Sequence, residues 1–308
     1  MAKAAKTTTE SQEIKIFPLG RGEVTFAIVG ESPMIFNRMA EKAKRELLFP
    51  SGGRKTAADR AGTLKHEPVT EYRDSIYRNH GDKAETRLKL PAPCFKGAMM
   101  TAALDLPGTR RTEIGRLVWV TGSHVDVYGI PSLFMNTVRS ADIAKTPDIR
   151  TRAICAQWAC QVTVRFVTPK LTPTAVYNLL HGAGMVSGVG DFRQEKGKGN
   201  YGQFRVCELD DPEYLFLTKN CGRAAQDAAL LDENVPCFDE DSEELLGWFH
   251  AELKRRREAV TVVKIGKGKG EPEPEGDDTG VKKTLARGKT KLRAVAAKTK
   301  AAPRRKAA

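Results

Sequence analysis

Residues 184–206 read GMVSGVGDFRQEKGKGNYGQFRV, and six of these 23 residues are glycine. A helix-like stretch, residues 172–182, precedes this glycine segment, and a strand-like stretch, residues 203–209, follows it. Glycine adopts positive φ and lets a backbone N–H approach a ligand without a Cβ in the way. N–H groups in such turns form concave sites for anions. We therefore expect the glycine segment to link a helix to a strand and to present its amides to phosphates.

Basic and aromatic side chains are interspersed with these glycines. Those expected to contact a nucleic acid, together with two of the glycines, are Gly188, Gly190, Arg193, Lys196, Lys198, Tyr201 and Arg205. Rings such as Tyr201 and Phe192 stack on bases, which contributes about 1–3 kcal/mol per base in known systems. The segment is not a Walker A loop, because GVGDF lacks the GK[ST] ending.

A simpler interpretation of the glycine segment remains open. It is then a mobile hairpin between a helix and a strand, and its charges are only solvated. In that interpretation Arg193 forms an ion pair with Asp191 or Glu195, and Phe192 packs into the core.

The 308-residue chain is basic, with a formal net charge of +13 and a pI near 9.5. Residues 264–308 hold 14 Lys and Arg against 5 Asp and Glu, a surplus of +9 that leaves +4 for residues 1–263. A basic surplus attracts polyanions, of which nucleic acid is the commonest. The tail residues expected to contact it are Lys282, Lys283, Lys289, Lys291 and Arg293. The alternative is that the cationic tail only aids solubility.

Composition divides the chain into three parts. Residues 1–12 are polar and are expected to be disordered, and they lack the apolar run of a signal peptide. Residues 13–263 are expected to fold, and the Lys/Ala-rich residues 264–308 bury too little apolar surface to do so. The chain has no apolar run long enough to cross a bilayer. We expect a cytoplasmic protein without a membrane partner.

The six cysteines do not form a metal-binding pattern. Cys155 and Cys160 are not in CxxC spacing, and no histidine pair lies near them in the sequence. We expect reduced thiols, no metal and no cofactor.

Patterns of apolar residues predict a mixture of helices and strands. In residues 22–30 Val24, Phe26 and Ile28 alternate with smaller or polar residues, as in a strand. Asn37 is expected to cap a helix over residues 38–48, and residues 50–68 are expected to form a long loop. The other predicted elements are helices over 69–77, 94–104, 172–182 and 240–260 and strands over 86–90, 117–127, 161–166 and 203–209.

Three segments carry a resemblance to a known family. Residues 88–103, LKLPAPCFKGAMMTAA, resemble the LPxSSLKGxLR element of the RAMP superfamily, whose members form the backbone and caps of CRISPR RNA-guided complexes. The glycine segment resembles the C-terminal glycine-rich loop of that superfamily. Residues 29–38, VGESPMIFNR, resemble the opening of small bacteriophage proteins that have the same features. The chain departs from the CRISPR pattern at Pro93-Cys94 and Met99-Met100.

The resemblance implies an α+β, modified ferredoxin-like (RRM-like) domain with an antiparallel sheet and insertions. It also implies that single-stranded DNA or RNA lies over one sheet face and the glycine segment, that copies self-associate along the strand, and that the compartment is the host cytoplasm. Lys96, where a helix begins, would face phosphate together with the helix dipole. Arg38, after the SPMIFN turn, would add a further contact. The alternative for Lys96 is an ordinary solvated lysine.

The predicted function is therefore non-enzymatic binding of single-stranded nucleic acid, directed at its backbone. No HExxH, GxSxG or paired-aspartate motif stands out. The acidic pairs Asp210-Asp211 and Glu240-Asp241 are expected in a turn and at a helix start, where solvation or capping explains them. One alternative is a RAMP-type endoribonuclease with His181, placed at the end of a predicted helix, as general acid or base. A second alternative is a virion or scaffold protein whose tail contacts the genome.

Overall fold

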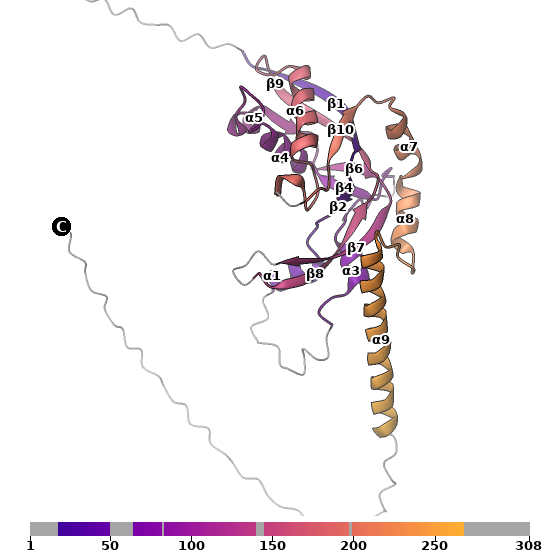
Figure 1. Cartoon of the computed structure of the whole chain (residues 1–308). Helices are drawn as coiled ribbons and strands as arrows, with labels where there is room; N and C mark the ends of the chain where they lie inside the picture. Colours follow the sequence, from indigo (N-terminus) through magenta and orange to yellow (C-terminus); the bar gives the residue numbers. More distant parts are fainter. Residues whose placement is uncertain (1–17, 50–63, 82, 140–144, 197–198, 268–308) are drawn as a thin grey trace, which may run out of the picture. The chain divides into compact units, whose positions relative to one another are not determined.

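The computed structural model describes residues 18–49, 64–81, 83–139, 145–196 and 199–267 (Figure 1). Contacts divide the chain into two units, Met1–Arg255 and Arg256–Ala308. The elements described below belong to the first unit, except that the last helix, α9 (Glu240–Lys267), includes residues of both. Within the described residues no helix has the length and apolar character needed to span a membrane.

The larger sheet is antiparallel throughout and is organised around β9. Its strands follow the order β10-β1-β9-β6-β4-β3, and β5 also pairs with β9. Their bounds are β1 (Gly20–Gly30), β3 (Tyr77–Arg78), β4 (Leu88–Pro91), β5 (Val118–Val120), β6 (His124–Tyr128), β9 (Ala159–Thr168) and β10 (Phe204–Cys207). β1 pairs with β9 over its whole length, whereas β5 and β6 share the other edge of β9.

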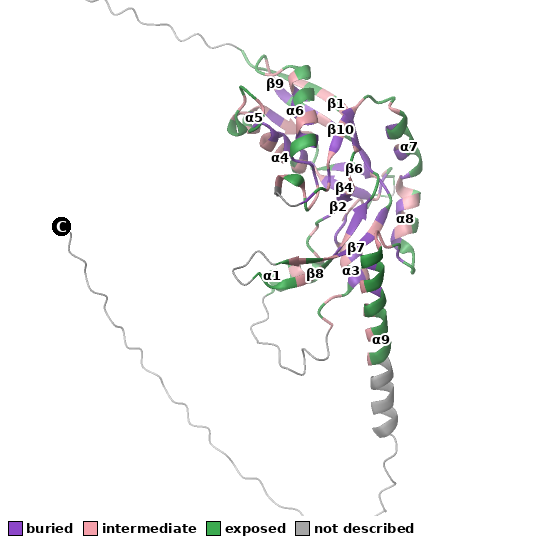
Figure 2. Ribbon diagram, in the orientation of Figure 1, coloured by how far each residue is buried: buried purple, intermediate pink, exposed green. Residues whose placement is uncertain are grey.

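The alternation of residues along β9 decides which face of this sheet is the core. Cys160, Val162, Val164 and Phe166 are buried, and the residues between them are exposed or intermediate. Because side chains on a strand alternate between its two faces, the buried set packs against helices on one side. These helices are α4 (Pro93–Ala102), α5 (Arg111–Leu117) and α6 (Pro173–Val186), which share the main hydrophobic cluster with β9 (Figure 2).

The opposite face is covered at one end by α7 (Pro212–Asn220), through Tyr214 and Leu217. The next helix, α8 (Arg223–Leu231), contributes Gln226, which is fully buried. Its side-chain oxygen accepts from the amide of Leu88 at 3.0 Å, and its nitrogen donates to Val127 at 2.8 Å. One amide therefore connects α8 to both β4 and β6.

A second, three-stranded sheet has the order β2-β8-β7. Its bounds are β2 (Met34–Ile35), β7 (Pro131–Arg139) and β8 (Pro147–Cys155). The helix α3 (Pro68–Asp74) packs on it, with the Tyr72 hydroxyl donating to Pro131 at 3.1 Å. The start of α9 is tied to the same sheet, because Ser242 accepts from the Met135 amide at 2.9 Å. The short helix α1 (Glu41–Leu48) has no buried residue (Figure 2).

The expected mixed α/β domain with an antiparallel sheet is confirmed. The predicted strand over residues 117–127 is wrong: the region holds the end of α5 and then the separate strands β5 and β6. Gly122, with φ +83°, makes the turn between them, and both strands then pair with β9. Strands β7 and β8 and helices α7 and α8 were not predicted.

Two predicted helix ends are also corrected. The first helix begins at Glu41 and its cap is Ala40, not Asn37, because the amides of Phe36 and Arg38 bond to the carbonyls of Ala153 and Ser75. The helix predicted over 172–182 continues to Val186 as α6. Within it Gly184 lies so close to β10 that a Cβ would come 1.9 Å from the carbonyl of Phe204.

The remaining expectations concern the chain's ends, its long loop and its cysteines. Helix α9 runs through Val263, where the domain boundary was expected. Residues 1–12, most of the predicted loop over 50–68 and the tail from residue 268 lie outside the described residues. All six cysteines are unpaired, and Cys155, Cys160 and Cys221 are buried.

A candidate nucleic-acid interface

The glycine segment lies directly against β2. Ile35 and Asp191 form a β-bridge in which the Asp191 amide donates to Ile35 at 2.9 Å, and the amide of Gly202 donates to Pro33 at 2.8 Å. The structure thus brings together two segments, 29–38 and 184–206, that are far apart in the sequence. The third segment, 88–103, reaches the same region, since Phe95 of α4 packs edge-on against Phe204 with centroids 5.9 Å apart.

The glycines serve close packing, which corrects the expected role of their amides. Gly188 is buried with φ +70°, and its N–H donates to the carbonyl of Ala183 at 2.9 Å, so it does not face a ligand. Gly190 has φ +86°, and a Cβ there would lie 2.6 Å from the carbonyl of Ile35. A Cβ on Gly202 would lie 1.7 Å from the carbonyl of Val189. The glycine segment is therefore a scaffold, and any contact with a ligand falls to side chains around it.

Arg193 forms an internal ion pair, as the simpler interpretation of the segment held. Its guanidinium lies 3.0 Å from the carboxylate of Glu195. The same carboxylate accepts from the hydroxyl of Thr101 on α4 at 3.3 Å and from that of Ser187 at 3.4 Å. Glu195 thus fastens the glycine segment to α4 and to the end of α6.

Arg205 is also engaged within the protein. It contacts Asp211 at 2.8 Å and Glu213 at 2.9 Å. The hydrogen bonds that Arg205 donates to these two carboxylates raise the pKa of Arg205. The Arg205 guanidinium and the first amides of α7 hold the pKa of Asp211 at about 2. The pair connects β10 to α7, and the charge of Arg205 is largely neutralised.

The two aromatic residues of the segment lie together. Tyr201 lies between Phe134 and Phe192, with centroid distances of 6.0 Å to each. Phe192 has φ +51°, which is uncommon for a residue with a Cβ, and its side chain is 39% exposed. The expected alternative of core packing is therefore wrong for Phe192. Its ring is available for stacking.

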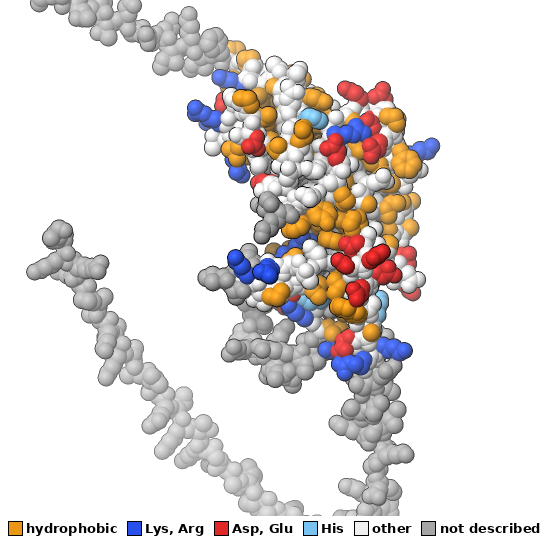
Figure 3. All heavy atoms as spheres, in the orientation of Figure 1, with side chains coloured by type: hydrophobic (Ala, Val, Ile, Leu, Met, Phe, Trp, Pro, Cys, Tyr) orange, Lys and Arg blue, Asp and Glu red, His pale blue; other side chains and the backbone are white. Residues whose placement is uncertain are grey.

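A pocket of about 710 Å³ opens beside Asp191; we call it the β8 pocket. It lies between α1, α3 and β8, and Arg38 is among the residues that line it. Its charged lining residues are Arg38, Lys42, Glu46, Lys65, His66, Glu67, Glu71, Asp74, Asp148, Arg150, Arg152 and Asp191. Figure 3 shows Lys and Arg side chains gathered over α1 and β8 in this region.

The charges of the β8 pocket are paired unequally. Arg152 forms an ion pair with Asp191, and Arg38 donates to the carbonyl of Asp74 at 2.9 Å. Among the lining residues, Lys42 and Arg150 form no ion pair with any residue that the structure describes, and neither do Glu46 and Glu67. Burial lowers the pKa of Arg152, Asp191 raises it, and the positive charge of Arg150 lowers it again. The carboxylate of Asp191 thus offsets part of the repulsion between the two guanidinium groups.

His66 is held between two carboxylates of this pocket. Its ring nitrogens lie 3.1 Å from Glu71 on α3 and 3.0 Å from Asp148 on β8. Because both nitrogens are engaged, the imidazole links α3 to β8 and neither nitrogen is available to a substrate.

The other predicted residues do not join this site or are not described. Lys96 is half-buried in the first turns of α4. His181 lies inside α6, stacked on Tyr177 with an interplanar angle of 2°, and not at a helix end. The side chain of Lys196, together with Lys198, Lys282, Lys283, Lys289, Lys291 and Arg293, lies outside the described residues.

Sequence reasoning missed the two arginines of β8 as site residues. The signal was present in residues 147–155, where Arg150 and Arg152 alternate with Ile149, Thr151 and Ala153. That alternation is typical of a half-buried strand with a cationic face.

Comparisons with protein-family models and with curated proteins found no match to this chain.

Proposed function

We propose that this protein binds the backbone of single-stranded nucleic acid at the β8 pocket, without catalysis. The observation that carries the proposal is the pair Lys42 and Arg150. They form no ion pair with a described residue and lie in a pocket beside the glycine segment. Cations placed in this way bind phosphates and release counterions, whatever the base sequence.

Phe192 supplies the preference for single strands. It follows directly on Asp191, which lines the pocket, and its ring is partly exposed. Stacking of a base on an aromatic ring requires an unpaired base and tolerates any of the four. In this binding mode Lys42 and Arg150 bind phosphates and Phe192 stacks on a base. Such binding does not depend on the base sequence of the nucleic acid.

The proposal includes the RAMP-like, modified ferredoxin-like identity of the domain. It is supported by an antiparallel sheet with α4, α5 and α6 on its core face, although α7 covers one end of the other face, and by the meeting of the three segments that carry the resemblance. The basic tail would add affinity without selectivity, because contacts to phosphates alone carry no sequence information.

Fluorescence anisotropy with labelled oligonucleotides tests this function. Single-stranded DNA, single-stranded RNA and duplex DNA are titrated over a series of salt concentrations, with the full chain and with a chain ending at Lys267. We expect both forms to prefer single strands, with a salt slope of about −0.7 for each phosphate contacted. Equal affinity for duplex, or loss of all binding with the tail, would refute binding by the folded domain.

The same titration separates binding from cleavage. After incubation the labelled RNA is resolved on a denaturing gel, and we expect it to remain intact. Shortened products that are lost in a His181→Ala variant would establish the endoribonuclease alternative.

A further inference from the structure

Helix α1 exposes its apolar residues at one end. Leu47, Leu48 and the capping residue Phe49 are 72%, 71% and 72% exposed, and no residue of the helix is buried. An isolated helix of this length is marginal in water, and its stability in proteins comes from packing of an apolar face. Large exposed apolar side chains gathered in one place mark interaction sites. This end of α1 therefore lacks a partner surface within the described part of its own chain.

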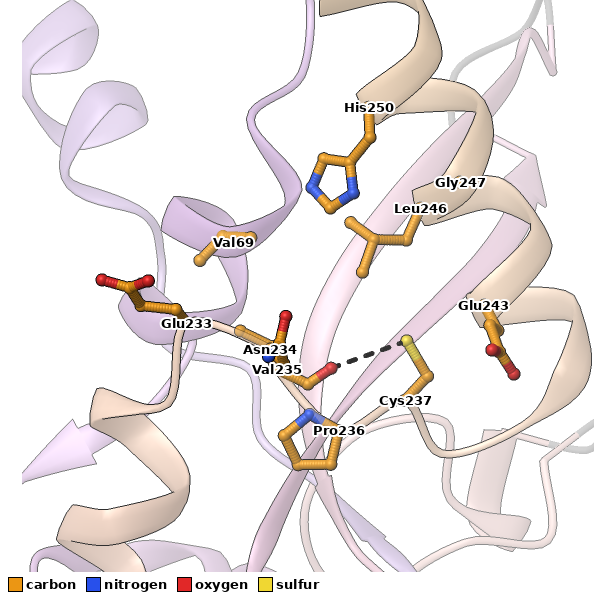
Figure 4. Close-up of a pocket in the computed structure, with 10 residues that line it drawn as sticks. All are labelled: Val69, Glu233, Asn234, Val235, Pro236, Cys237, Glu243, Leu246, Gly247 and His250. Carbon is orange, nitrogen blue, oxygen red and sulfur yellow. Dashed lines mark hydrogen bonds between the residues drawn. The ribbon is translucent and has the colours of Figure 1, made fainter.

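A pocket of matching chemistry lies elsewhere on the same unit. It has a volume of about 420 Å³ and is formed by α3, the α8–α9 connection and α9; we call it the α9 pocket (Figure 4). Val235 and Leu246 are buried in its floor, and Val69 and Pro236 line it as well. Glu233, Asn234, Glu243 and His250 line it beside these apolar residues. A volume of this order, with apolar side chains and a few polar groups, is typical of sites that enclose a ligand group.

Charge distinguishes the two surfaces. Helix α1 carries Lys42, Lys44 and Arg45 against Glu41 and Glu46, a surplus of one positive charge, whereas Glu233 and Glu243 stand at the α9 pocket. The first turn of α9 adds Glu240 and Asp241. Figure 3 shows acidic side chains over α8 and the start of α9, and basic side chains over α1. Opposite charges around an apolar contact favour encounter and fix its orientation.

We propose that α1 of one copy of this chain binds the α9 pocket of a second copy, with Leu48 and Phe49 inserted between Val235 and Leu246. Strand β8 and helix α3 lie between α1 and α9 within one molecule (Figure 1). The two surfaces differ, so the contact is heterologous: each copy retains a free α1 and a free pocket, and repetition produces an open chain of copies. This inference does not depend on nucleic acid and goes beyond the proposed function, since it places successive β8 pockets along one assembly.

Two complementary variants test the contact. The donor variant, Leu48→Asp with Phe49→Asp, makes the end of α1 polar and acidic. The acceptor variant, Glu243→Lys with Gly247→Leu, reverses a charge and fills the α9 pocket. A Cβ on Gly247 meets no atom within 4 Å, so the helix tolerates the change. All four positions are exposed, and thermal unfolding confirms that both variants fold.

Sedimentation velocity of the full-length proteins, without nucleic acid, gives the readout. We expect the wild-type chain of 33.9 kDa to form species larger than a dimer as its concentration rises. Each variant alone should remain a monomer. Mixed in equal amounts they should form a 1:1 dimer and nothing larger, because only one functional α1 and one functional pocket remain in the pair.

Helix α7 supplies the matched control. Phe216 is 57% exposed on α7, and Phe216→Asp should leave assembly unchanged. A wild-type chain that stays monomeric at its highest soluble concentration would overturn the proposal. So would assembly of the donor variant alone, or loss of assembly in Phe216→Asp. Binding of a short oligonucleotide by the monomeric variants tests the proposed function separately. We expect these variants to bind it, because the β8 pocket does not depend on assembly.

Discussion

The amide of Asp191 donates to the carbonyl oxygen of Ile35 at 2.9 Å, and the two residues form a β-bridge. This contact connects the SPMIFN turn to the glycine segment. It leaves the Asp191 side chain to pair with Arg152 of β8. Asp191 therefore connects the SPMIFN turn, the glycine segment and β8. The positions of the cations in the β8 pocket depend on these contacts.

The glycine segment should tolerate no side chain at Gly202. With φ +76° and a Cβ 1.7 Å from the carbonyl of Val189, Gly202→Ala is expected to lower the free energy of unfolding by about 3 kcal/mol or more. Gly97 in α4 is the control, because its Cβ would meet no atom within 4 Å. Gly97→Ala should raise stability by about 1 kcal/mol. Urea denaturation measures both, and equal effects would contradict the packing role of Gly202.

The hydrogen bonds of Gln226, which connect α8 to β4 and β6, should contribute strongly to stability. Gln226→Leu removes the acceptor of the Leu88 amide and the donors to Val127 and Cys221 in a fully buried place. Buried groups without partners cost about 1–3 kcal/mol each, so we expect a loss of about 3 kcal/mol in urea denaturation. Gln161→Leu, on the exposed face of β9, should change stability by no more than about 0.5 kcal/mol.

The sequence predicted well those elements whose residues carry their own periodic signal. Strand β1 and the helices α4, α6 and α9 were found because their apolar periodicity or helix signals lie within the element itself. Strands β5 and β6 were merged, because both are short and only their shared pairing with β9 separates them. The end of α6 was placed early, at Gly182, because the glycine-rich residues from Gly184 on were expected to form a loop. The structure uses Gly184 for contact with β10.

The ion pair of Asp211 should make stability depend on pH in the acid range. Arg205 and the amides of α7 hold the pKa of Asp211 at about 2, below its value of about 3.9 in unfolded chains. A depressed pKa contributes stability that is present above about pH 4 and is lost as the pH falls toward 2. Asp211→Asn should therefore cost most above pH 4, by no more than about 1 kcal/mol because the pair lies near the surface, and the difference should vanish near pH 2. A difference that is constant across pH would rule out this linkage.

Phe192 should affect binding and not folding. Phe192→Gly removes an exposed ring and also relieves a left-handed backbone, so stability should change by no more than about 1 kcal/mol. Affinity for a single strand should fall about tenfold or more, since stacking contributes about 1–3 kcal/mol per base. Phe216→Ala on α7 serves as the control, with unchanged affinity by anisotropy. Equal affinities of Phe192→Gly and wild type would exclude stacking on this ring.

The candidate site could be predicted only in part, for a reason visible in Arg193 and Arg205. Both stand in a glycine-rich basic segment, yet both are paired with carboxylates, Glu195 and Asp211. The sequence shows where basic residues occur. It does not show which of them form ion pairs with carboxylates in the folded protein. Lys42 and Arg150 are exposed by the tertiary arrangement of α1 and β8, and local pattern does not reveal that arrangement.

The central claim is tested most directly by the salt dependence of single-strand binding in a Lys42→Ala/Arg150→Ala variant of the full chain. Each lost phosphate contact should reduce the magnitude of the slope of log affinity against log salt by about 0.7, so the double variant should lose about 1.4. Lys219→Ala, an exposed lysine on α7, should keep the wild-type slope. A double variant with the wild-type slope and affinity would show that the β8 pocket does not contact the nucleic acid.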